Sequence, residues 1–349
     1  MLPNLFHFAT SELSQDAVLC WLLSWADNKH KESHPYLHDV ATALLSVIYR
    51  RAKIEMPPVF SNIEIRKQQG GIDVLCIINN ELVVLIEDKV GTKQHSDQLA
   101  RYKEYLFNIL GFAKDKVIPV YIQTGDQSDY LEVEKHGYHT LERRDLLEIF
   151  ESESGKFAKS RSDIFRDFSD HLRQIEDDVQ SYRLLPPTEW SWNSWKGFYT
   201  DIQQQLQNGS WDYVANPTGG FLGFWWHFIE TDECEVYLQL EQEKFCFKIS
   251  VNNAERRRDL RKFWYEKITS KCLKYGLKAK RPDRFGNGQY MTVAVLDQEY
   301  RIVNDDGLIN IADTLTILNA AQSVIDGCLS TVLQGAAPDG NSATLHCRR

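Results

Sequence analysis

Residues 70–102 read GGIDVLCIINNELVVLIEDKVGTKQHSDQLARY, two apolar stretches on either side of a short polar turn. Their β-branched and aliphatic composition predicts strands over residues 72–78 and 82–89. Four charged side chains interrupt these apolar strands: Asp73, Glu87, Asp88 and Lys89. Charged side chains are almost never fully buried unless they are paired or bound to something. The stretch therefore predicts a site at the end of a hairpin.

The length of the turn decides which of these side chains meet. Side chains alternate between the two faces of a strand, so Glu87 and Lys89 share one face and Asp88 points to the other. A three-residue loop at 79–81, or a bulge, places Asp73 opposite Glu87, whereas a two-residue loop puts Glu87 on the wrong face. We predict the register that brings Asp73 and Glu87 together.

Two carboxylates on neighbouring strands, about 5 Å apart, can chelate one hard cation such as Mg²⁺ or Mn²⁺. Such an ion lowers the pKa of a bound water, and a nearby lysine positions the nucleophile or offsets charge that develops on phosphate. The alternative is an ordinary ion pair between Asp73 and Lys89 at the strand ends. The run GIDVLCI, LVVLIEDKV and DQLARY, with Glu-x-Lys inside an apolar strand, favours the cation site.

These motifs, preceded by the helical segment SELSQDAVLCWLL, resemble the PD-(D/E)XK nuclease superfamily over about residues 8–150. Within it, the chain looks similar to a poorly characterised bacterial subfamily of the RecB-like branch. Position 72 is isoleucine where the motif name has proline. The resemblance implies Asp73, Glu87 and Lys89 as catalytic residues and Glu12 as a third metal ligand beside Asp73 and Glu87. It also implies that Gln98 and Tyr102, the Gln-x-x-x-Tyr helix motif, orient water or phosphate.

The resemblance further implies a fold and a reaction. The expected fold class is α/β, a restriction-endonuclease-like core with a mixed central sheet flanked by helices. The expected function is that of a Mg²⁺- or Mn²⁺-dependent endonuclease, a hydrolase of phosphodiester bonds that acts on DNA, in bacterial defence against phage or other foreign DNA. The alternative is a protein that keeps the nuclease fold but only binds nucleic acid or senses a ligand. Whether the chain forms a homo-oligomer or needs an activating partner stays open.

The 349 residues are too many for one ordinary core, and the composition changes after Pro186 and Pro187. We predict a nuclease-like domain over residues 1–183 and an α+β domain with an antiparallel sheet over 184–333. The tail, 334–349, lacks apolar periodicity and is expected to be disordered. Seven of the nine tryptophans follow Pro187, and large aromatics are usually core, with stacking on exposed bases as the alternative.

The charge of the chain is unevenly distributed. The net charge is −9, but residues 255–284 carry twelve Lys and Arg against four Asp and Glu. A local basic face on an acidic protein is compatible with phosphate binding. The candidate nucleic-acid-binding residues in this segment are Arg256, Arg257, Arg258, Arg261 and Lys262. The alternative is a solvated amphipathic helix whose buried stripe is Leu260, Phe263, Trp264, Ile268 and Cys272.

The remaining features point to a cytoplasmic protein. Seven scattered cysteines form no Cys-x-x-Cys pair, which favours reduced thiols over disulfides or a zinc site. The first residues have no secretory pattern, and no apolar run approaches the roughly 20 residues of a membrane span. His30, His34 and His38 recur every four residues, but Pro35 interrupts a helix that would carry them, so no histidine metal site is expected.

Overall fold

The structure is a computed structural model that describes residues 3–93, 97–216 and 219–335, with only the backbone described for 330–335. It divides into two compact units, Met1–Asp177 and Asp178–Arg349. The predicted division into functional domains at residue 183 stays a prediction. The tail expected to be disordered lies, from residue 336 on, outside the described residues.

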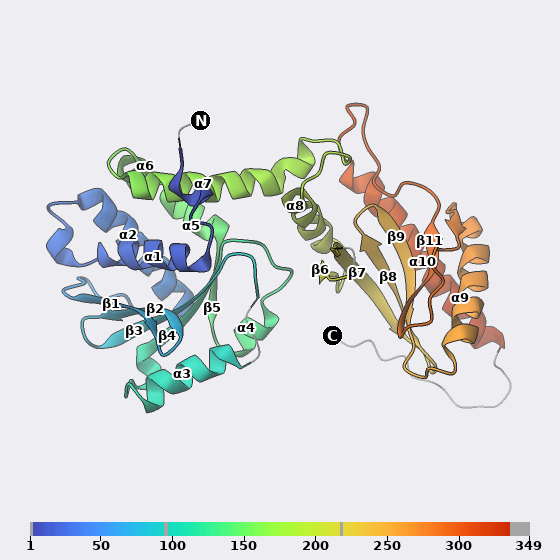
Figure 1. The fold of residues 1–349 in the computed structure, drawn as a ribbon, viewed down its shortest axis with the longest axis horizontal. Helices are drawn as coiled ribbons and strands as arrows, with labels where there is room; N and C mark the ends of the chain where they lie inside the picture. Colours follow the sequence, from blue (N-terminus) through green and yellow to red (C-terminus); the bar gives the residue numbers. More distant parts are fainter. Residues whose placement is uncertain (1–2, 94–96, 217–218, 336–349) are drawn as a thin grey trace. The chain divides into compact units, whose positions relative to one another are not determined.

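The N-terminal unit is built on a five-stranded mixed sheet with the strand order β1-β2-β3-β4-β5 (Figure 1). The first three strands form an antiparallel meander, and β3, β4 and β5 run parallel. The strand bounds are β1 Ile63–Gln69, β2 Ile72–Ile78, β3 Leu82–Lys89, β4 Val117–Gln123 and β5 His139–Glu142. The mixed sheet confirms the predicted fold class, and β2 and β3 have the predicted bounds.

Helices cover both faces of this sheet (Figure 1). One layer packs on the face of Val74, Cys76 and Ile86, and the other on the face of Leu75 and Leu85. The first layer contains α1 Glu12–Ser24, α2 Pro35–Ala52, α5 Arg143–Phe150, α6 Glu153–Lys159 and α7 Asp163–Gln180. The second contains α3 Gln98–Asn108 and α4 Leu131–Lys135. Short 3₁₀ turns complete the unit: η1 Leu5–His7, η2 Asn28–His30, η3 Lys114–Lys116 and, just beyond it, η4 Ser181–Arg183.

The β2–β3 hairpin has the predicted three-residue loop. Ile78 pairs with Leu82 and Val74 with Ile86, so residues 79–81 form the turn. Asn79 and Asn80 have φ of 52° and 58°, a left-handed conformation that asparagine tolerates better than most residues. Continued by one residue, this register sets residue 73 opposite residue 87. The predicted register is therefore confirmed.

The C-terminal unit is an α+β structure around a six-stranded antiparallel sheet with the order β10-β11-β9-β8-β7-β6. Its strands are β6 Ser210–Val214, β7 Phe221–Glu230, β8 Glu235–Glu241, β9 Lys244–Ser250, β10 Ala279–Lys280 and β11 Tyr290–Leu296. Its helices are α8 Trp192–Gln203, α9 Arg257–Cys272, η5 Leu273–Tyr275 and α10 Ile311–Gly335. The predicted antiparallel sheet is thus confirmed.

Most of the tryptophans of this unit belong to its core. Trp195, Trp211, Trp226 and Trp264 are buried together with the inward residues of the sheet, as expected for large aromatics. Phe263, predicted to lie on the buried stripe of α9, is 46% exposed. That prediction was wrong because Leu260, Trp264, Ile268 and Cys272 already fill the face of α9 that meets the sheet.

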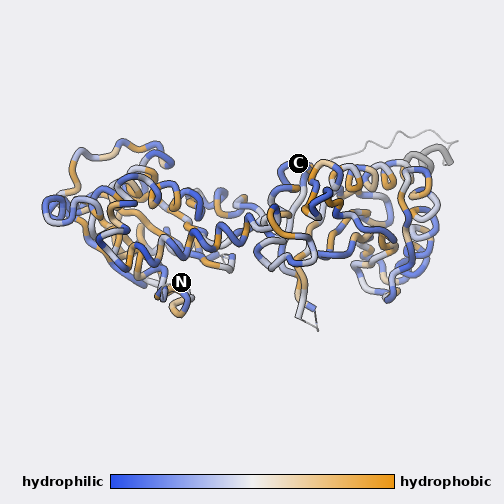
Figure 2. The backbone as a smooth tube through the Cα atoms, turned by 90° about the horizontal axis from the view of Figure 1, so that it is seen from above, coloured by the Kyte–Doolittle hydropathy of each residue, from blue (hydrophilic) through white to orange (hydrophobic). Residues whose placement is uncertain are grey.

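Hydrophilic and hydrophobic residues alternate along the helices of both units, the pattern of helices that are covered on one side only (Figure 2). Over the part of the chain that the structure describes, no helix is both long and apolar enough to cross a membrane.

Candidate active site

The end of the β2–β3 hairpin brings the predicted carboxylates and lysine together. Lys89 Nζ lies 2.6 Å from Glu87 Oε1 and 3.7 Å from Glu12 Oε2. Glu87 is 0% and Lys89 5% exposed. Asp73 follows from the register as the neighbour of Glu87 across the two strands. Glu12 and Glu87 thus meet at the buried ammonium group of Lys89, and Asp73 lies beside Glu87.

Glu87 is an unusually weak acid in this surrounding. Burial is the largest cause, and the charge of Asp73 adds to it; together they raise the pKa of Glu87 to about 8 although Lys89 acts in the opposite direction. Its second oxygen, Oε2, is buried and accepts no hydrogen bond from the residues that the structure describes. A buried carboxyl oxygen without a donor, beside a second carboxylate, fits a divalent cation.

Asp73 is held in place by two donors. The backbone N–H of Asp88 donates to Asp73 Oδ2 at 2.9 Å, and Gln68 Nε2 donates to Asp73 Oδ1 at 3.1 Å. The same Gln68 Nε2 lies 3.0 Å from Asp16 Oδ2. Gln68 takes φ of 55°, which is strained for a residue with a long side chain. The backbone conformation of Gln68 thus aims its amide at both carboxylates.

Glu12, the first residue of α1, reaches the site from the neighbouring layer. Its Oε1 accepts hydrogen bonds from Thr92 Oγ1 at 2.7 Å and from the backbone N–H of Val90 at 3.4 Å, while Oε2 faces Lys89. Within the described ranges, no group of three or more His, Cys, Asp or Glu side chains is arranged to hold a metal ion. The pair Asp73 and Glu87 is the set that the geometry favours, and Glu12 as a third ligand stays a prediction.

Asp88 points to the opposite face, as predicted for the middle residue of Glu-x-Lys. There Gln15 Nε2 donates to Asp88 Oδ1 at 2.6 Å, and Gln15 Oε1 accepts from Thr124 Oγ1 at 2.7 Å. Burial raises the pKa of Asp88 well above its ordinary value, and burial with the charge of Asp73 raises the pKa of Asp16 to about 6. This polar cluster connects α1 to the ends of β3 and β4.

Gln98 and Tyr102 lie on α3, which covers the Glu87 face of the sheet. Gln98 Nε2 and Tyr102 Oη are 2.7 Å apart. Burial raises the pKa of the Tyr102 hydroxyl, with further contributions from the charges of Glu87 and Asp73. The helix therefore presents the predicted pair toward the acidic side chains, and their roles in orienting water or phosphate stay predictions.

Four residues of this site were not anticipated: Gln15, Asp16, Gln68 and Thr124. Gln15 and Asp16 follow Glu12 by three and four residues, so they share its side of α1. Two polar residues at this spacing in an otherwise apolar helix were a sequence signal that could have indicated them. The contribution of Gln68 depends on a left-handed backbone conformation, which glutamine rarely adopts, so no pattern in the sequence pointed to it.

The candidate nucleic-acid-binding residues lie in the C-terminal unit and differ in their surroundings. Arg256 pairs with Glu233 at 2.6 Å, and Arg257 Nε donates to the carbonyl of Val251 at 3.1 Å. Lys262 is 3.9 Å from Glu266. Arg258 is exposed, whereas Arg261 is buried. The five basic residues therefore do not form one uniform surface.

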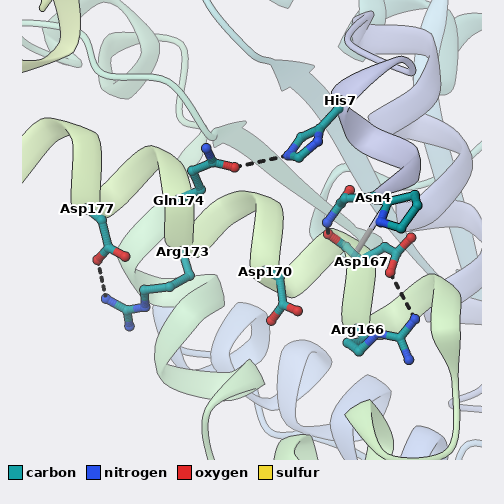
Figure 3. Close-up of a pocket in the computed structure, with 9 residues that line it drawn as sticks. Asn4, His7, Arg166, Asp167, Asp170, Arg173, Gln174 and Asp177 are labelled. Atoms are coloured by element: carbon teal, nitrogen blue, oxygen red, sulfur yellow. Dashed lines mark hydrogen bonds and ion pairs between the residues drawn. The ribbon is translucent and has the colours of Figure 1, made fainter. Parts of the chain in front are cut away.

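A groove of the N-terminal unit between η1 and α7 contains none of the predicted site residues (Figure 3). His7 Nε2 lies 3.1 Å from Gln174 Oε1, and Asn4 Nδ2 donates to the Asp167 carbonyl at 2.7 Å (Figure 3). These contacts fasten the start of the chain to α7 and indicate a structural role.

Comparison with known proteins agrees with the fold of the N-terminal unit. Residues 3–167, which contain the whole mixed sheet and every residue of the acidic site, match the family model of the PD-(D/E)XK nuclease superfamily. The N-terminal unit belongs to the PD-(D/E)XK nuclease superfamily. No curated protein and no solved structure matches the chain significantly.

Proposed function

We propose that this protein is a Mg²⁺- or Mn²⁺-dependent endonuclease that hydrolyses phosphodiester bonds of DNA. The observation that supports this most directly is the buried Glu87 carboxyl, next to Asp73 and 2.6 Å from Lys89. When Asp73 and Glu87 are both ionised, the ion pair with Lys89 leaves one carboxylate uncompensated, and burial makes this state costly, so that the metal-free protein holds a proton on Glu87. A bound cation beside a phosphate would balance the two carboxylates.

In this proposal, the residues of the chain bind the metal ion and place a positive charge beside it. Asp73 and Glu87 would hold the ion, which when bound polarises phosphate oxygens and lowers the pKa of water. Burial lowers the pKa of Lys89, but the hydrogen bond and charge of Glu87 and the charges of Glu12 and Asp73 outweigh it and raise the pKa above its ordinary value. Lys89 would therefore act as a fixed cation for the attacking water and the phosphate. Gln98 and Tyr102 supply an amide and a hydroxyl next to this face for orienting them.

The choice of DNA and a role in bacterial defence against foreign DNA rest on the family alone, whereas a cytoplasmic location rests on the seven scattered cysteines and the absence of a secretory pattern. The alternative function is a nucleic-acid-binding or ligand-sensing protein that does not cut. Asp73, Glu87 and Lys89 all being present favours cleavage, since a binding protein has no need of this combination.

The test is cleavage of supercoiled plasmid, linear duplex, single-stranded DNA and RNA, each with Mg²⁺ and with Mn²⁺. Asp73→Asn and Lys89→Met should each reduce the rate by a hundredfold or more, on the order of the loss expected for a charge that stabilises the transition state. Glu81→Gln, an exposed carboxylate in the turn of the same hairpin, is the matched control and should cut normally. Cleavage that survives both active-site substitutions would show that another site is responsible, and no cleavage by the wild type would favour the alternative.

A further inference from the structure

Two arginines of the C-terminal unit pack against one aromatic ring, and a third lies close enough for its charge to act on one of them; none of the three has an acidic partner among the residues that the structure describes. The guanidinium carbon of Arg261 lies 3.9 Å and that of Arg281 4.4 Å from the ring centre of Phe285. Arg261 Nη1 donates to the carbonyl oxygen of Phe285 at 2.7 Å, which fastens the segment 281–289 to α9. Arg258 stands one turn before Arg261 on the same helix. A helix and a loop separated in sequence thus bring cations to one place.

These cations repel one another. Burial lowers the pKa of Arg261, and the charges of Arg281 and Arg258 lower it further. Arg261 is 9% exposed, and its Nε is buried without a hydrogen-bond partner among the residues described. Arg258 and Arg261 also lie in the first turns of α9, where the helix dipole is positive and disfavours cations. An arrangement with so much uncompensated positive charge is suited to an anion.

The rest of the basic segment is compensated within the chain. Arg256 pairs with Glu233, Lys262 lies near Glu266, and Lys280 is 2.7 Å from Asp297. In contrast, neither Arg258 nor Arg281 forms an ion pair with any residue in the described part of the chain. The sequence alone does not distinguish these cations, whereas the structure shows which of them lie beside acidic side chains.

We propose that Arg261 and Arg281, which pack against Phe285, together with Arg258, one turn before Arg261 on α9, bind phosphate groups of a nucleic-acid strand. Planar guanidinium groups hold phosphate oxygens through two hydrogen bonds at once. Two guanidiniums already pack against the ring of Phe285, so we expect the site to contact the strand through its backbone and not by stacking on its bases. The choice of a strand as the ligand rests on the proposed nuclease function.

The experiment measures binding of fluorescein-labelled duplex and single-stranded DNA to the full chain in EDTA, as fluorescence anisotropy over a range of salt concentrations. The variant Arg258→Gln/Arg281→Gln removes two exposed cations that have no ion-pair partner among the described residues. Its matched control, Arg256→Gln/Lys262→Gln, removes the same number of charges from the start of α9 and the residue before it, where Glu233 and Glu266 compensate them. Thermal unfolding of both variants checks that they fold alike.

The first variant should lose about tenfold or more in affinity at low salt and flatten the salt dependence by up to about two in logarithmic slope, since each duplex phosphate contact contributes about 0.9. The control should stay close to wild type. Equal loss in both variants, or loss in neither, overturns the proposal. So does displacement of the strand by a mononucleotide at low concentration, which would identify a free nucleotide as the ligand.

This outcome is separable from that of the nuclease proposal because EDTA removes the metal. Selective loss of binding in a protein that never cuts would support the phosphate site and refute the nuclease. Metal-dependent cutting with unaltered binding in both variants would support the nuclease and refute the phosphate site.

Discussion

At the scale of single residues, the site is governed by what burial does to Glu87. A carboxyl that ordinarily titrates near 4.5 has its pKa raised to about 8. In metal-free protein, the folded chain therefore keeps a proton that the unfolded chain releases between these two pH values. The contribution of Glu87 to the free energy of unfolding falls through this window as pH rises, at about 1.4 kcal/mol per pH unit, and is constant below it.

Glu87→Gln should remove that dependence, because the amide has nearly the same shape and does not titrate. In EDTA, the difference in unfolding free energy between the variant and wild type should shift in favour of the variant as the pH rises from 5 to 8. Urea unfolding at several pH values measures it. A difference that stays constant over the whole range would mean that Glu87 is already ionised at pH 5.

Gln68 offers a second residue-scale prediction, because its strain and its contacts can be separated. Gln68→Gly relieves the left-handed strain at φ of 55° but deletes the amide that holds Asp73 and Asp16. The unfolding free energy should stay within about 1 kcal/mol of wild type. The Mn²⁺ concentration needed for half-maximal cleavage should nevertheless rise by about tenfold, as for lost outer-shell support of a metal ligand.

Gln68→Glu is the informative companion variant, since it retains the length of the side chain while replacing the donor with another carboxylate. It should raise the Mn²⁺ concentration needed for half-maximal cleavage as much as the glycine variant does, or more. Equal metal dependence in all three proteins would show that Asp73 needs no support from Gln68.

At the scale of elements, the hairpin turn sets the site. Deleting Asn80 leaves a two-residue loop, which shifts β3 by one residue and turns Glu87 and Lys89 toward the wrong face. The same shift moves the apolar residues of β3 to opposite layers, so we expect severe destabilisation, with a thermal midpoint far below wild type and no cleavage. Asn80→Gly retains the loop length and suits the φ of 58°. It should fold and cut like wild type, and a deletion variant that does the same would refute the register as the determinant.

The elements of the site were predictable to different degrees. The strands of the hairpin and their register followed from two apolar runs, the spacing of Asp73 and Glu87 and the two asparagines between them. The short β5, β6 and β10 and the helix α8 were not anticipated, because brief segments bury too few residues to leave a period in the sequence. In the basic segment, the partners that distinguish Arg256 from Arg258 come from strands and loops that periodicity does not place.

At the scale of the whole molecule, two separate cores predict two unfolding events. The residues that pack around the mixed sheet and those that pack around the antiparallel sheet form different clusters, and Tyr182 is the first residue of the second. Domains with their own cores unfold as their own cooperative units. Calorimetry of the full chain should therefore show two transitions. Mn²⁺ should raise the temperature of only one, because a ligand stabilises the unit that binds it in its folded form.

Asp73→Asn identifies which transition belongs to the acidic site. In this variant, Mn²⁺ should change the temperature of neither transition. The transition that does not respond to Mn²⁺ in wild type should have the same temperature in the variant. The chemistry would then reside wholly in the unit that contains Asp73, Glu87 and Lys89, and the arginines around Phe285 would act on where the strand is held. A single transition that Mn²⁺ raises as a whole would instead show that the two cores unfold together, with the metal site stabilising both.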